Sequence, residues 1–201
     1  MLVTLRESLV RLRVMLVDDS DAELVPIKEA LLQCGYDVVE VSTSAVALLD
    51  RVAAMQPDVI IIRSDSPTRD TLEQLSFVSA RQPRPIVLFT EERDHATIQA
   101  ALRAGVSAYV VAGMQPDRLQ PILDVAVARF EQEQALRDEL RSAQDRLAER
   151  KLIERAKGIL MDQRKLPEAD AFRFMRKLAM DRSTTIADIA RRIIEASDLL
   201  G

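Results

Sequence analysis

Five short apolar runs alternate with amphipathic segments along the first two thirds of the chain. The runs are rich in Val and Ile and end at turn residues, which predicts strands at residues 14–17, 38–41, 59–62, 86–89 and 108–111. Between them, apolar residues recur at helical spacing in residues 24–34, 45–55, 70–80 and 96–104. Gly35 and Gly105 stand where the first and fourth helices must end. The alternation predicts a flavodoxin-like α/β fold, a five-stranded parallel sheet covered on both faces.

A long helix follows, from Asp117 to about Arg164, with no proline beyond Pro121 and no glycine before Gly158. Within it a 4-3-4 spacing of apolar residues predicts a coiled-coil seam and a homodimer, formed by Leu136, Leu140, Ala143 and Leu147. Charged residues interrupt the same frame further upstream. The alternative is a solvated linker helix that packs one stripe on the first domain.

The last fifty residues carry three further apolar stripes, which predict a small three-helix module. Pro167 suits the first turn of its second helix, and Thr185 with Asp188 resembles a capping box that opens the third. Residues 150–192 contain twelve Lys and Arg but only six Asp and Glu, for a net charge of +6. The whole chain carries −4, which leaves −10 for the remainder. A basic module on an acidic body suits a protein that binds a polyanion.

Composition narrows the remaining chemistry. Cys34 is the single cysteine, so no internal disulfide can form and a reducing cytoplasm is expected. No apolar run reaches the ~18 residues of a membrane span, and residues 1–12 predict a polar tail rather than a signal peptide. One Cys and one His cannot supply a zinc site, and neither a phosphate-binding loop nor a catalytic constellation is present. We therefore expect neither an enzyme nor a bound metal or cofactor.

Three stretches of the C-terminal module, namely Ala156-Lys157-Gly158-Ile159-Leu160-Met161, Ala171-Phe172-Arg173-Phe174-Met175-Arg176 and Ala179-Met180, occur in the order and spacing of a known family. They resemble the ANTAR domain, which implies binding to RNA hairpins and prevention of transcription termination. By this resemblance Gly158 and the alanines are structural, and small residues there let helices approach closely. The candidates for contact with RNA phosphates and loop bases are Lys157, Arg176, Arg150, Arg155, Arg164, Lys165 and Arg173. The alternative for each of them is a solvated surface charge. Phe172 is expected in the core, and Phe174 is the better candidate for base stacking.

The first domain resembles the response-regulator receiver domain. Asp18 and Asp19 follow the first strand, where receivers hold Mg²⁺, and Thr90 occupies the family's hydroxyl position at the end of the fourth strand. These three residues form a residual acidic site. Arg63, however, stands at the expected phosphoacceptor position, and Ala112-Gly113 replaces the family's lysine turn. An arginine cannot accept a phosphoryl group, because phosphorylation needs a carboxylate nucleophile.

We expect Arg63 to take the place of the metal and to neutralise the acidic pair through charge-assisted hydrogen bonds. The domain is therefore predicted to be a pseudo-receiver that serves as a scaffold for protein interactions. Two alternatives stay open from the sequence. Asp65 could act as a substitute phosphoacceptor, and Asp18 with Asp19 could simply cap the first helix.

Taken whole, the chain resembles the nitrate-assimilation antiterminator regulators of the NasT-like type. The predicted domains are a tail (1–12), a pseudo-receiver (13–128), a coiled-coil linker helix (129–149) and an ANTAR domain (150–201). The resemblance implies binding to hairpin RNA in a leader transcript and inhibition by a ligand-sensing protein partner that responds to nitrate or nitrite. The alternatives are a DNA-binding orphan response regulator and an interaction adaptor whose last helices only dimerise.

Overall fold

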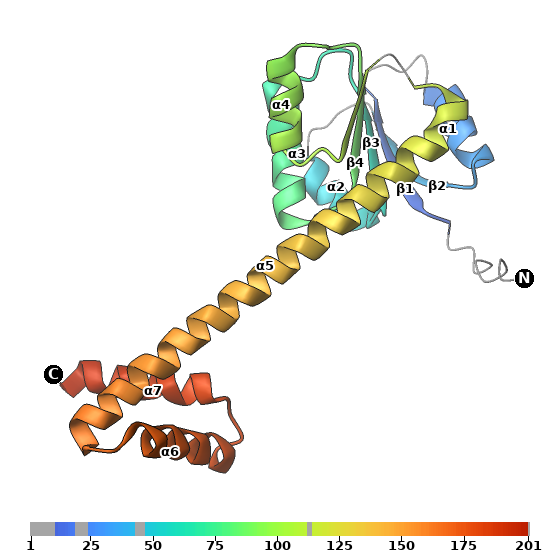
Figure 1. The fold of residues 1–201 in the computed structure, drawn as a ribbon. Coiled ribbons are helices and arrows are strands. Elements are labelled where there is room, and N and C mark those ends of the chain that lie inside the picture. The colour runs from blue at the N-terminus through green and yellow to red at the C-terminus, as the bar shows by residue number, and fades with distance from the viewer. Residues whose placement is uncertain (1–10, 19–23, 43–46, 112–113, 201) are drawn as a thin grey trace, which may run out of the picture. The chain divides into compact units, whose positions relative to one another are not determined.

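The computed structural model describes residues 11–18, 24–42, 47–111 and 114–200 (Figure 1). The chain forms two compact units, Met1–Glu133 and Gln134–Gly201, and a single long helix, α5 (Pro116–Arg164), contributes to both. Among the described helices, none is long and apolar enough to cross a lipid bilayer.

The first unit is built on a five-stranded parallel sheet. Its strands are β1 (Arg13–Asp18), β2 (Asp37–Ser42), β3 (Val59–Arg63), β4 (Ile86–Thr90) and β5 (Ala108–Val111). They are arranged in the order β2-β1-β3-β4-β5, and every neighbouring pair is parallel. This is the flavodoxin-like order, so the fold class predicted from the sequence is confirmed.

Helices cover both faces of this sheet, as Figure 1 shows. They are α1 (Leu24–Gln33), α2 (Leu48–Met55), α3 (Arg69–Arg81), α4 (His95–Arg103) and the first part of α5. Alternate residues of each strand point to opposite faces. Leu16 and Ile61 therefore pack with α1 and α5, whereas Val17 and Ile62 pack with α2, α3 and α4.

The predicted ends of the helices agree with the structure within a few residues. The second helix begins at Leu48 rather than at residue 45, because Ala47 adopts a left-handed conformation as its N-cap; residues 45 and 46 lie outside the described part of the chain. Gly35 and Gly105 follow α1 and α4 with φ angles of +87° and +92°. Both glycines end their helices as predicted, since only glycine adopts these angles without strain.

These two glycines should respond differently to substitution. We expect Gly35→Ala to lower the free energy of unfolding by about 1 kcal/mol, the cost of a left-handed alanine with open space around its Cβ. Gly105→Ala should cost about 3 kcal/mol, because its Cβ would also lie 2.5 Å from Ser79 Cβ, an atom that cannot rotate away. Hydrogen exchange of the sheet amides in the two full-length variants measures the difference. Equal losses would contradict the steric argument.

The second unit is a three-helix module, made by the end of α5, α6 (Glu168–Asp181) and α7 (Ile186–Leu200). Its buried core consists of Ala156, Leu160, Ala171, Met175, Ala179, Ile189, Ala190 and Ile194. The predicted capping box is confirmed: the Asp188 amide donates to Thr185 Oγ1 at 3.1 Å, and the Thr185 amide donates to Asp188 Oδ2 at 3.4 Å. Pro167 is the N-cap of α6 rather than a residue of its first turn.

Two predictions about this core were wrong. Phe172 is 40% exposed, whereas Phe174 packs against the core, because α5 and α7 cover the side of α6 that carries Phe174. Gly158 does not mark a close approach of helices, since a Cβ built there meets no atom within 4 Å. The alanines at 156, 171, 179 and 190 are buried as predicted.

Candidate functional site

The first candidate site lies at the carboxyl ends of β1 and β3. The parallel register places Asp18 directly beside Arg63. Arg63 Nε lies 3.1 Å from Asp18 Oδ1 and 3.0 Å from Oδ2. The Asp18 side chain is 1% exposed and that of Arg63 is 14% exposed, so the pair is largely shielded from water. The ion pair expected between these two residues is present.

The described residues of this site do not fit a divalent cation. In the described part of the site, the position at the end of β3 offers a guanidinium where metal coordination would need an oxygen ligand. The same position offers no carboxylate to attack a phosphoryl group. Asp65 has an exposed side chain, and its backbone carbonyl accepts a bond from Thr90 Oγ1 at 3.0 Å. Asp19 and Ala112-Gly113 lie outside the described residues.

Thr90 ties neighbouring loops together. Besides its bond to Asp65, its hydroxyl accepts from the Glu92 amide at 3.1 Å. The Tyr109 hydroxyl donates to the Glu92 carbonyl at 3.0 Å, and burial raises the pKa of this tyrosine above its ordinary value. The hydroxyl of Thr90 is therefore engaged with backbone, and the loops after β3 and β4 are fixed to each other.

The second candidate site is the basic surface of the three-helix module. Lys157 is 9% exposed, and its Nζ lies 2.7 Å from Glu168 Oε1 and 2.9 Å from Glu154 Oε2. The hydrogen bond with Glu168, and then that with Glu154, raises the pKa of Lys157, and the ammonium group lowers the pKa of Glu168. Lys157 thus joins α5 to the start of α6, and its charge is already balanced within the module.

The other predicted basic candidates fall into two groups. Arg155 pairs with Asp198 at 3.0 Å, and Arg173 pairs with Asp170 at 3.1 Å; both pairs are exposed to solvent. The second group consists of exposed side chains that form no ion pair with any described residue, and its members are Arg150, Arg164, Lys165 and Arg176. This second group carries positive charge that is available to a ligand.

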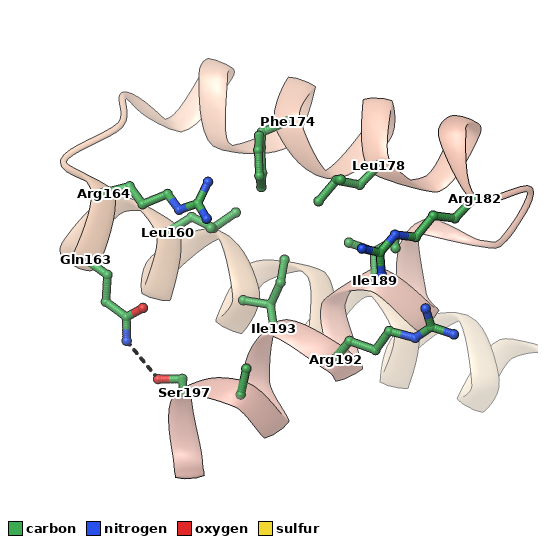
Figure 2. Close-up of a pocket in the computed structure, with 11 residues that line it drawn as sticks. Leu160, Gln163, Arg164, Phe174, Leu178, Arg182, Ile189, Arg192, Ile193 and Ser197 are labelled. Carbon is green, nitrogen blue, oxygen red and sulfur yellow. Dashed lines mark hydrogen bonds between the residues drawn. The ribbon is translucent and has the colours of Figure 1, made fainter. Parts of the chain in front are cut away.

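Two further arginines of this surface were not among the RNA contacts predicted from the sequence. Arg182 ends α6 as its C-cap, and Arg192 lies on α7, three residues after the buried Ile189. Figure 2 shows both at one end of a pocket that has Arg164 at its other end. Both are exposed and form no ion pair within the described chain. Their spacing in the sequence gave no signal, because only the packing of α5, α6 and α7 brings the three side chains to one pocket.

Comparison with known proteins agrees with this architecture. The response regulator receiver domain family matches residues 14–124, and the ANTAR domain family matches residues 141–194. The chain is 31% identical over 183 residues to the transcriptional regulatory protein PdtaR of Mycobacterium tuberculosis H37Rv, covering 91% of this chain and 89% of that protein. It is also 41% identical over 66 residues to the nitrate regulatory protein of Klebsiella oxytoca, which covers 33% of this chain and 17% of that protein.

Solved structures support the fold of the first unit. A CheY-like receiver domain from Methanospirillum hungatei superposes with a TM-score of 0.54 at 22% identity, covering 61% of this chain and 98% of that one. The receiver domain of a diguanylate cyclase from Desulfovibrio desulfuricans gives the same TM-score, identity and coverage. The chain therefore belongs to the family of response regulators in which a receiver domain is joined to an ANTAR domain.

Proposed function

We propose that this protein is an RNA-binding transcription antiterminator that binds hairpins in a leader transcript and prevents the terminator hairpin from forming. The observation that carries the proposal is the group of exposed basic side chains without carboxylate partners on the ANTAR module. Such cations can neutralise RNA phosphates, which supplies most of the sequence-independent affinity of nucleic-acid binding. Two relatives of the chain, a transcriptional regulatory protein and a nitrate regulatory protein, support a role in transcription.

Control by a protein partner, rather than by phosphorylation, is the second part of the proposal. Its support is the Arg63–Asp18 ion pair, because Arg63 stands at the position where receiver domains carry the phosphoacceptor aspartate. We propose a ligand-sensing partner that holds the regulator inactive until it detects nitrate or nitrite. Treatment of the protein with acetyl phosphate should leave its mass unchanged. A phospho-aspartate found by mass spectrometry, at Asp65 or elsewhere, would overturn this part.

A salt-titrated binding assay tests the RNA-binding function. The purified full-length protein is titrated with the leader RNA of the operon next to its gene, without any phosphodonor. The same sequence as duplex DNA, and an RNA whose stem is disrupted by mismatches, serve as controls. We expect binding that requires the intact hairpin. Binding to the duplex DNA alone would favour a DNA-binding response regulator, and binding to neither would favour an interaction adaptor.

The salt dependence of binding should separate the basic residues into two classes. We expect Arg182→Ala to reduce the slope of log K against log salt by about one unit, as the loss of one phosphate contact does. Lys157→Ala should leave the slope nearly unchanged, because two carboxylates already hold its ammonium group. Fluorescence anisotropy at several salt concentrations measures both slopes. A drop of one unit for Lys157→Ala would return that residue to the set of RNA contacts.

A further inference from the structure

The three-helix module contains a pocket that neither the family resemblance nor the proposed function explains. Its volume is about 330 Å³, at the small end of the range for ligand sites. The walls are apolar and come from all three helices, with Leu160, Phe174, Leu178, Ile189 and Ile193 among them. Figure 2 shows Phe174 and Leu178 of α6 facing Ile193 of α7 across the opening.

The charges around this pocket all have the same sign. Arg164, Arg182 and Arg192 line it, and no carboxylate does so among the described residues. The Arg164 guanidinium lies 4.7 Å from the centre of the Phe174 ring, which holds it over the pocket. The site thus combines apolar side chains with arginines at its two ends (Figure 2), and its ligand should have an apolar face and negative charge beside it.

A nucleotide in a single-stranded segment has this combination. Its base offers a planar face for stacking, and the phosphates on either side are anionic. A paired base inside a duplex cannot enter such a pocket, whereas an unpaired loop base can turn out of the stack. Gln163 adds hydrogen-bonding groups at one edge: its Nε2 donates to Ser197 Oγ at 3.1 Å, while Oε1 and the second N–H stay available to a base edge.

We infer that this pocket receives one base turned out of the loop of the bound hairpin, with the neighbouring phosphates on Arg164, Arg182 and Arg192. The inference rests on the proposed RNA-binding function and adds how the protein recognises the loop of the hairpin. Backbone contacts position the protein, and the enclosed base makes binding depend on the loop sequence.

The test combines a blocked pocket with a scan of the RNA loop. The probe is a pool of RNA hairpins with a fixed stem and a randomised loop, from which the full-length protein selects a binder. Each loop nucleotide of that binder is then replaced by an abasic one. We expect one abasic position to weaken binding to the wild type about tenfold or more, the scale of one stacked base.

Ala196→Trp supplies the blocked pocket, because Ala196 lines the opening and is exposed. This variant should bind the intact hairpin about tenfold more weakly than the wild type does. Its affinity for the hairpin with the sensitive abasic position should be the same as for the intact hairpin. Ala169→Trp, at an exposed position of α6 away from the pocket, is the matched control and should behave as the wild type. If Ala196→Trp loses helix content, Ala196→Leu, a smaller obstruction at the same position, takes its place in the same cycle.

The outcomes separate the two proposals. If the protein binds a hairpin, but every abasic position weakens the binding of the wild type and of Ala196→Trp equally, the base-binding inference is overturned and the RNA-binding function stands. Selection of no hairpin at all would overturn both. If Ala196→Trp instead changes the oligomeric state of the protein and leaves the response to the abasic RNAs unchanged, a second copy of the chain occupies the pocket, and the inference is wrong.

Discussion

Replacing Arg63 with alanine is expected to lower the free energy of unfolding of the first unit by about 3 kcal/mol. The reason is the buried partner: Asp18 is 1% exposed, and the substitution takes away the guanidinium that neutralises its carboxylate in a site shielded from water. Because the chain has two units, hydrogen exchange of the β1 and β3 amides in the full-length protein is the appropriate measurement.

The control for this experiment is Arg69→Ala. Arg69 also forms an ion pair, with Glu73 at 2.9 Å, but its side chain is 90% exposed. Such surface pairs contribute roughly 0–1 kcal/mol, so this variant should be nearly neutral. Asp18→Asn combined with Arg63→Ala should recover part of the loss, since it removes the carboxylate that the guanidinium had neutralised. If Arg63→Ala is as stable as Arg69→Ala, the pair does not neutralise the site, and the structural basis of the pseudo-receiver proposal fails.

The Arg63–Asp18 pair was expected from the resemblance to receiver domains, which puts position 63 beside the acidic pair that follows the first strand. The structure confirms that β1 and β3 are neighbours and that their carboxyl ends lie side by side. The two-sided burial of β1 and β3 follows from the same runs, which lack the alternation of a half-exposed strand. In this unit the pattern of apolar runs agrees with the strands of the fold, whereas the roles of individual residues at the strand ends came from the family resemblance.

In the three-helix module, the hydrophobic period did not predict which side chains of one helix contact another helix. Phe172 and Phe174 lie on opposite flanks of the apolar stripe of α6, and the periodicity favoured Phe172 as the core residue. Only the positions of α5 and α7 decide that Phe174 is covered and Phe172 is not. The same holds for Lys157, whose partner Glu168 belongs to the next helix. Contacts between helices depend on their packing, which the hydrophobic period does not encode.

The packing also explains why Arg182 and Arg192 could not be recognised in the sequence. Each is an ordinary exposed arginine on its own helix, and Arg182 has a local role near the negative end of α6. Their significance comes from sharing a pocket with Arg164, on a third helix. A basic composition predicted a polyanion ligand for the module, but the pocket that we propose for one base could be located only in the fold.

The linker part of α5 carries an exposed apolar stripe. Leu136, Leu140 and Leu147 are 59%, 60% and 55% exposed, and Ala143 between them is exposed as well. Further upstream, Leu119 and Ala126 occupy the same heptad positions, but they belong to the buried core of the first unit. In that part of α5 the apolar stripe therefore packs within the unit. Exposed leucines at a and d positions are costly unless a second helix covers them, which supports the proposed homodimer.

Leu140→Glu with Leu147→Glu is therefore expected to convert a dimer into a monomer, because four like charges would face one another across a paired seam. Light scattering measures the change in mass. If each dimer engages two hairpins, the affinity for a tandem-hairpin RNA should fall by roughly 10²–10⁴, while the affinity for a single hairpin stays the same. Ser142→Glu with Ala148→Glu adds the same charge at exposed positions off the seam and should leave the dimer intact. A wild-type protein that is already monomeric would instead establish α5 as a solvated linker, and each module would then bind its hairpin alone.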